Sequence, residues 1–148
     1  MLNQTWRAAG LKTNSSQLGS LGNNMKPLKI LHTADWHLGQ RLMYLEREPE
    51  QAAALEWLHQ CICEEQVDIL IVAGDVFDLR SPPNTALKLY YRFLTGLLHS
   101  PCRHVIITGG NHDSPAVLNA PRELLEVLNV YVVGGATDTP EDCILRLK

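Results

Sequence analysis

The chain has 148 residues, a length that suits a single domain able to bury a core. Its composition, 45% hydrophobic and 20% charged, is ordinary for a soluble globular protein, and no apolar stretch approaches the roughly 20 residues that span a bilayer. The formal net charge of −3 argues against a nucleic-acid binder without excluding one, because bound cations or a basic partner could compensate for it.

Residues 1–24 differ in composition from the rest of the chain. They contain Arg7 and Lys12 but no acidic residue, and they are rich in Asn, Ser and Gly without a sustained apolar period. This composition predicts a disordered N-terminal extension, with the folded part over residues 25–148. A transit peptide is the alternative, but an extension upstream of an internal start at Met25 is favoured, because the segment has one arginine and no amphipathic face.

From Leu28 onward, predicted strands and helices alternate. Strands are expected over 28–33, 69–72, 103–108 and 130–133, with a fifth over 143–147; helices are expected over 49–65, from Ser81-Pro82-Pro83 to 99, and from Ser114-Pro115 to 128. This alternation predicts an α/β fold with a largely parallel sheet and right-handed crossovers.

Most apolar and aromatic side chains on the predicted helices are expected to form the core. This applies to Leu55, Leu58, Ile62, Leu87, Leu94, Leu97 and Leu98, and to Trp57, Tyr90 and Tyr91, for which core packing is favoured over a base-stacking platform. The four cysteines, Cys61, Cys63, Cys102 and Cys143, show no C-x-x-C spacing. Small buried side chains in a reducing cytoplasm are therefore favoured over a zinc site or disulfides.

Polar clusters follow three of the predicted strands. They are Asp35-x-His37, Gly74-Asp75-x-x-Asp78 and Gly110-Asn111-His112-Asp113. Each cluster alone is a weak signal, since a turn or a helix cap could use the same residues. Because parallel strands end at one edge of a sheet, the three clusters are expected to converge there, where α/β sheets bind their ligands.

These residue types suit a metal centre. Asp35 and His37, two positions apart on an extended segment, can direct oxygen and nitrogen towards one ion. Asp75 could bridge two ions, and Asn111 can offer a carbonyl oxygen to the second. Such mixed ligation favours manganese, iron or zinc over calcium. His112, beside a ligand and with a spare carboxylate nearby, has the arrangement of an acid–base group.

Together the three clusters resemble the blocks D-x-H, G-D-x-x-D and G-N-H-D/E of the calcineurin-like metallophosphoesterases. The longer strings over residues 30–40, 72–78 with 81–83, and 109–114 are similar to those of bacterial SbcD-type nuclease subunits. The resemblance covers about residues 27–135. It implies an αββα sandwich, of which this chain would carry mainly the first sheet with its helices.

The resemblance also implies roles and partners. Asp35 and His37 would bind the first of two divalent ions, most readily Mn²⁺, with Asp75 bridging both and Asn111 binding the second. His112 would act on the scissile phosphate while Asp78 orients its imidazole. The implied reaction is phosphodiester hydrolysis in DNA repair and recombination. The implied partners are DNA and an SbcC-like ATPase subunit, with a homodimer of the complete subunit and no membrane.

Two departures from the family pattern affect the expected function. Leu79 stands where the phosphatases of the family have an arginine, which argues against a protein phosphatase. Three later histidines, in a G-H block and a G-H-x-H block, are not found, because His112 is the only histidine after Asn111. The chain is therefore expected to be the N-terminal part of the nuclease domain and inactive or weakly active alone.

The alternatives are a non-catalytic binding module with this fold, and another metallophosphoesterase such as a phosphatase or a cyclic-nucleotide phosphodiesterase. A scaffold has no physical need for the full set of polar residues, so their presence favours descent from a working enzyme. The missing histidines instead favour inactivity of the chain as written.

Overall fold

The computed structural model describes residues 26–136 and 144–147, so the expected extension over 1–24 and Cys143 lie outside the described residues. The elements in chain order are β1 Ile30–Thr33, β2 Arg41–Leu42, β3 Leu45–Glu46, α1 Glu48–Glu64, β4 Ile69–Ala73, α2 Asn84–Gly96, the 3₁₀ helix η1 Leu97–His99, β5 His104–Thr108, α3 Pro115–Asn119, α4 Arg122–Glu126 and β6 Val130–Val133. In the described part of the chain, no helix is both long and apolar enough to cross a membrane.

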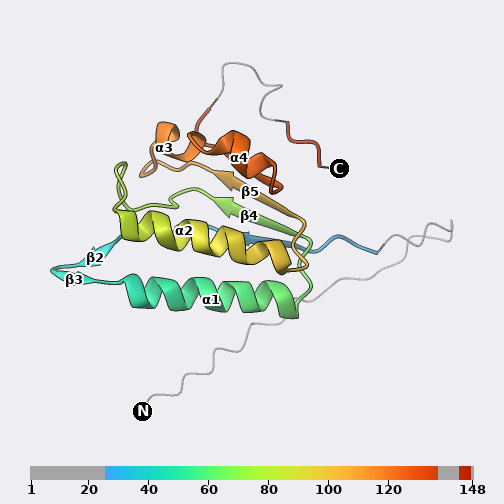
Figure 1. The fold of residues 1–148 in the computed structure, drawn as a ribbon, viewed down its shortest axis with the longest axis horizontal. Helices are drawn as coiled ribbons and strands as arrows, with labels where there is room; N and C mark the ends of the chain where they lie inside the picture. Colours follow the sequence, from blue (N-terminus) through green and yellow to red (C-terminus); the bar gives the residue numbers. More distant parts are fainter. Residues whose placement is uncertain (1–25, 137–143, 148) are drawn as a thin grey trace, which may run out of the picture.

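The main sheet has four parallel strands in the order β1-β4-β5-β6, which confirms the expected parallel α/β arrangement. In Figure 1, α1 and α2 run side by side along the sheet. The shorter α3 and α4 contact β6. Because all four strands run the same way, the loops that follow them meet at one edge.

One face of the sheet is covered by the helices. Residues of β4, β5 and β6 that share this face, such as Val72, Ile107 and Val132, are buried in a single core cluster. The helices contribute Leu55, Leu58, Ile62, Ala86, Leu89, Tyr90, Phe93, Leu94, Leu118 and Leu125 to the same cluster. Burial of one large aliphatic or aromatic side chain stabilises a fold by roughly 1.5–3 kcal/mol. Packing of the helices on this face therefore stabilises the parallel sheet.

The opposite face of the sheet is only half covered by the described residues. Ile71 pairs with Ile106, which pairs with Tyr131, and all three side chains are half-buried and lie outside the core cluster. We call Ile71, Ile106 and Tyr131 the open face. Alternation along each strand suggests that Ile69 and Ile71 share a face with Val105 and Ile107, or with their alternates. This grouping is wrong, because the register places Val105 and Ile107 on the covered face.

Three predicted segments differ from the structure. The connection after β1 contains an antiparallel hairpin, β2 with β3, which the sequence did not signal because it lacks an Asn-Gly or Asp-Gly turn. The helix expected from Ser114 to 128 is split into α3 and α4, since Pro121 lacks an N–H and interrupts the helical ladder. The fifth strand expected over 143–147 is wrong for the described residues 144–147.

Several side chains expected in the core are exposed. Trp57 on α1 is 58% exposed and Leu98 on η1 is 47% exposed, whereas Tyr90 is buried. Trp57 lies outside the stripe of Leu55, Leu58 and Ile62 that contacts the sheet. The described cysteines, Cys61, Cys63 and Cys102, are free thiols and half-buried, in agreement with the interpretation against disulfides.

At the amino ends of the strands, Asp68 joins three segments. Its carboxylate accepts a hydrogen bond from the backbone N–H of Lys29 at 3.0 Å and one from the Arg103 guanidinium at 3.1 Å. The Lys29 N–H is the main cause of the lowered pKa of Asp68, with Arg103 adding to it. Asp68 therefore stabilises the sheet at the end remote from the polar clusters.

We predict that the chain self-associates through the open face. The mass of the unaltered chain, measured by light scattering, should rise with its concentration. Replacement of Ile106 by Asp should lower this mass, because a charge there opposes burial of the apolar patch. Leu98→Asp, which adds the same charge on η1, is the matched control and should leave the association unchanged. A monomeric unaltered chain would contradict the prediction.

Candidate metal centre

The loops after β1 and β4 are joined by backbone hydrogen bonds that extend the parallel ladder. Asp35 N–H donates to the Gly74 carbonyl at 3.1 Å, and His37 N–H donates to the Asp75 carbonyl at 2.9 Å. One residue further along, Leu38 N–H donates to the carbonyl of Val76 at 2.9 Å. These bonds bring the first two polar clusters side by side, as the strand order requires.

Three of the polar residues have left-handed backbone conformations. The φ angles are +56° at Asp35, +45° at His37 and +50° at Asp75. Non-glycine residues adopt this region uncommonly, and it recurs where the surrounding structure holds a functional loop in place. Gln51 of α1 holds one of these loops: its amide donates to the His37 carbonyl at 2.9 Å and accepts from Gly39 N–H at 3.1 Å.

The side chains of Asp35, His37 and Asp75 form one potential ligand set. His37 Nε2 lies 3.9 Å from Asp35 Oδ1 and 4.0 Å from Asp75 Oδ2, and one ligand atom from each residue lies within 4.8 Å of the others. The Asp75 side chain is 14% exposed and that of Asp35 70% exposed, so the set is open to solvent on one side. This separation leaves space for an ion between the three atoms.

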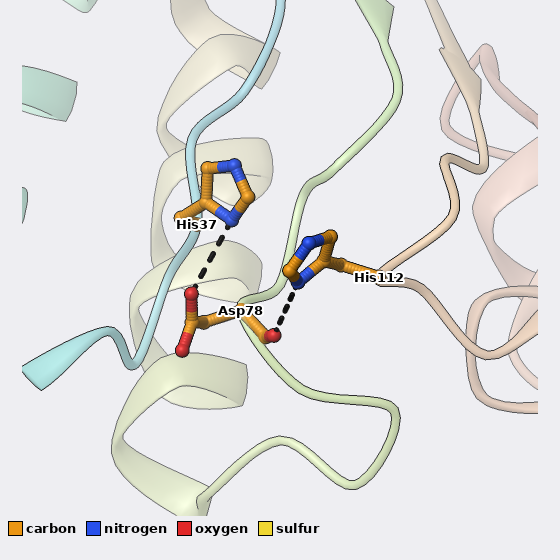
Figure 2. A group of neighbouring side chains, drawn as sticks. All are labelled: His37, Asp78 and His112. Carbon is orange, nitrogen blue, oxygen red and sulfur yellow. Dashed lines mark hydrogen bonds and ion pairs between the residues drawn. The ribbon is translucent and has the colours of Figure 1, made fainter.

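A second group consists of His37, Asp78 and His112, which come from three different loops (Figure 2). Asp78 Oδ1 lies 3.3 Å from His37 Nδ1, an ion-pair distance, although the atoms are not aligned as a hydrogen bond. The Asp78 carbonyl accepts a hydrogen bond from His112 Nδ1 at 2.9 Å. The two imidazole rings meet edge to face, with centroids 4.9 Å apart.

Asp78 therefore contacts His112 through its main chain, and its carboxylate faces His37 instead. Because a carbonyl can only accept, the Nδ1 of His112 must carry a proton, and its Nε2 is left for another partner. A carboxylate beside His37 Nδ1 likewise favours a proton there and leaves the Nε2 lone pair directed at Asp35 and Asp75. The expected orienting role of Asp78 stays a prediction, now with the contact made by the carbonyl.

The surroundings of His112 raise the pKa of its imidazole above the ordinary value. The main cause is the hydrogen bond to the Asp78 carbonyl, and the negative charges of Asp75, Asp78 and Asp113 add to it. Partial desolvation acts in the opposite direction. In the metal-free protein these surroundings thus stabilise the protonated ring more than solvent does.

The third loop packs tightly against the second. A Cβ added at Gly110 would overlap the carboxylate of Asp75, and one added at Gly74 would lie 3.2 Å from the Gly110 backbone. Only glycine allows this approach. His112 N–H donates to Asp75 Oδ1 at 3.0 Å, so the loop that carries Asn111 lies directly beside Asp75. The Asn111 side chain itself is exposed.

Two further residues shape the site and were not assigned roles from the sequence. Gln51 holds the first loop, as described above. Asp113 is buried and accepts backbone hydrogen bonds from both the second and the third loop. A helix-borne glutamine carries no sequence signal, whereas Asp113 directly follows His112 in the third cluster and could have been noticed there.

The charges at this edge fit a divalent cation. Among the described residues, the ion pairs of Asp35, Asp75 and Asp78 are formed only with His37, and neither lysine nor arginine contacts them. Carboxylates gathered without lysine or arginine beside them repel one another, and a bound cation relieves that repulsion. A cavity of about 350 Å³ adjoins Asp35 and His37 and is bounded on the other side by α1.

Comparisons with known proteins agree with this geometry. The profile of the family described as Calcineurin-like phosphoesterase matches residues 28–143. The chain is 47% identical over 114 residues to the SbcD component of the SbcCD nuclease of Escherichia coli K12, covering 77% of this chain and 28% of that protein. The corresponding SbcD proteins of Rhodobacter capsulatus and Bacillus subtilis are 44% and 39% identical, over 76% of this chain and 28% and 29% of theirs. The chain thus spans less than a third of the length of these curated relatives.

We predict that the pKa of His112, measured by NMR on the metal-free protein, lies above the ordinary value of about 6.5. The pKa of His112 is higher in the folded than in the unfolded protein. Its protonated ring therefore contributes its full stabilisation when the pH is below the pKa of the unfolded state. This contribution is lost as the pH rises through the pKa of the folded state. A His112 midpoint at or below about 6.5 would contradict the hydrogen-bond assignment.

Proposed function

The chain belongs to the calcineurin-like phosphoesterase family, and on this basis we propose that residues 25–148 are the first part of a metal-dependent DNA nuclease domain. The observation that carries the proposal is the set of ligand atoms from Asp35, His37 and Asp75, gathered within 4.8 Å. The likeness to nuclease subunits, at 39–47% identity, supports DNA as the substrate class.

We assign the ligands as follows. Asp35, His37 and Asp75 would hold one divalent ion, and Asp75 with the side-chain oxygen of Asn111 would hold the second. Two divalent ions, when bound, supply Lewis-acid stabilisation of the charge that develops on the phosphate, and this mixed oxygen and nitrogen set suits Mn²⁺. His37 is suited to its role because the carboxylate of Asp78 faces its Nδ1 and leaves Nε2 for the ion.

His112 is proposed as the acid–base group. Its Nδ1 proton is held by the Asp78 carbonyl, so its Nε2 is the atom that can donate a proton to the leaving oxygen or a hydrogen bond to the phosphate. The raised pKa favours the protonated ring that such a donor needs. Asp78 fixes both histidines in orientation, through its carbonyl and its carboxylate.

DNA, an SbcC-like ATPase and a second copy of the complete protein are the proposed partners. The relatives are named as one component of an SbcCD nuclease, which implies a second kind of subunit. Because the formal net charge of the chain is −3, much of the positive surface for the DNA backbone is assigned to the ions and to that partner.

The proposal predicts that Asp75→Asn weakens Mn²⁺ binding and abolishes Mn²⁺-dependent cleavage of duplex DNA by the complete protein. The Asp75 carboxylate would offset the charge of both ions. Its loss should therefore weaken Mn²⁺ binding by more than the roughly 10–100-fold that follows from changing a residue that only supports a metal ligand. Calorimetric titration of Mn²⁺ and an end-labelled duplex measure the two effects.

The matched control for this test is Asp68→Asn, which removes a carboxylate from the remote end of the sheet. It should lower the thermal stability but leave both the Mn²⁺ affinity and the cleavage rate unchanged. Near-normal cleavage by the Asp75→Asn variant would rule out the two-ion assignment.

A second prediction separates catalysis from metal binding. His112→Gln should retain Mn²⁺ while losing a factor of roughly 10² to 10⁴ in cleavage rate, the usual contribution of a positioned acid or base. His99→Gln, at an exposed position on η1, should change neither quantity. If the Mn²⁺ affinity collapses in the His112 variant, the residue is a ligand and the assigned role is wrong.

A further inference from the structure

Asp113 is a buried carboxylate that joins two of the site loops. Its side chain is 2% exposed. Its Oδ1 accepts from Phe77 N–H at 2.9 Å, and its Oδ2 accepts from Val76 N–H at 3.1 Å and from Gly110 N–H at 2.9 Å. Two donors thus come from the loop after β4, and the third comes from the loop after β5.

The three backbone donors need both oxygens of Asp113 as acceptors. A buried charge is costly unless hydrogen bonds satisfy it, and none of the ion pairs between described residues involves Asp113. The three N–H groups compensate for the charge. An asparagine has a single acceptor oxygen, and its NH₂ group would face at least one backbone N–H, so it could not reproduce the three bonds.

The backbone that Asp113 holds is the backbone that carries the proposed ligands. Val76 directly follows Asp75, and Gly110 directly precedes Asn111. Between them, His112 N–H donates to Asp75 Oδ1 at 3.0 Å. A shift of either loop would therefore change the spacing of Asp75 and Asn111 and the direction of the His112 ring.

We infer that Asp113 is a positioning residue, which locks the loop carrying Asp75 to the loop carrying Asn111 and His112 so that Asp75 and Asn111 can reach the same ion. The inference rests on the proposed function, because Asp113 matters for metal binding only if Asp75 and Asn111 are metal ligands. Asp113 itself would not be a ligand, because its two oxygens accept hydrogen bonds from backbone N–H groups.

The test compares Asp113→Asn with Asp68→Asn. Both variants replace a carboxylate that accepts backbone N–H, but only Asp113 joins the site loops. Mn²⁺ affinity is measured by titration at a temperature where circular dichroism shows each variant folded. We expect roughly 10–100-fold weaker Mn²⁺ binding in the Asp113 variant, the cost of removing a residue that supports a ligand, and no change in the Asp68 variant.

A second variant covers the case in which Asp113→Asn does not fold. Incorporation of phenyllactic acid at position 77 replaces the Phe77 N–H by an ester oxygen and removes one of the three bonds while every side chain stays in place. Weaker Mn²⁺ binding by this ester variant supports the inference.

The outcomes separate the two proposals. Absence of Mn²⁺ binding by the unaltered protein would contradict the proposed function and with it the role of Asp113. Normal Mn²⁺ affinity in folded Asp113→Asn, or in the ester variant where the first does not fold, would overturn the positioning role alone. A loss of affinity shared equally by the Asp68 variant would overturn it as well, because the effect would then be one of stability.

Discussion

The repulsion among carboxylates at one edge of the sheet is the constraint on which the rest of this structure depends. Parallel pairing of β1, β4 and β5 forces three loops to the same edge, where Asp35, Asp75 and Asp78 form ion pairs only with His37 among the described residues. Such a cluster is unfavourable in a metal-free protein and favourable around cations. The fold therefore holds these carboxylates closer together than their mutual repulsion favours.

The backbone, more than side-chain packing, sets the distances in this cluster. Asp35, His37 and Asp75 keep left-handed φ angles because hydrogen bonds to the neighbouring loop and to Gln51 hold their peptide groups. Gly110 allows the third loop to approach the Asp75 carboxylate. The three loops thus behave as one unit.

The sequence predicted the four parallel strands, the first two helices and the convergence of the polar clusters, because hydrophobic period and strand-end glycines are local signals. It could not predict which oxygen of Asp78 faces which histidine, since that depends on the left-handed turn at His37. It also misassigned the faces of β4 and β5, because their register comes from pairing between distant segments. The split of the helix at Pro121 was readable from the sequence and was missed.

The strand order β1-β4-β5-β6 follows the order of synthesis, and each strand of the main sheet pairs with the one made just before it. A chain emerging from the ribosome can therefore build the sheet by adding one strand and one helix at a time, without waiting for a distant partner. The loops become ordered in the same sequence: the turn at Asp35 needs β4 for its hydrogen bond, and Asp75 acquires its contact with His112 only after β5 is in place. The cluster of Asp35, Asp75 and His112 is thus complete only after β5 is in place, although Asp35 lies near the start of the described residues.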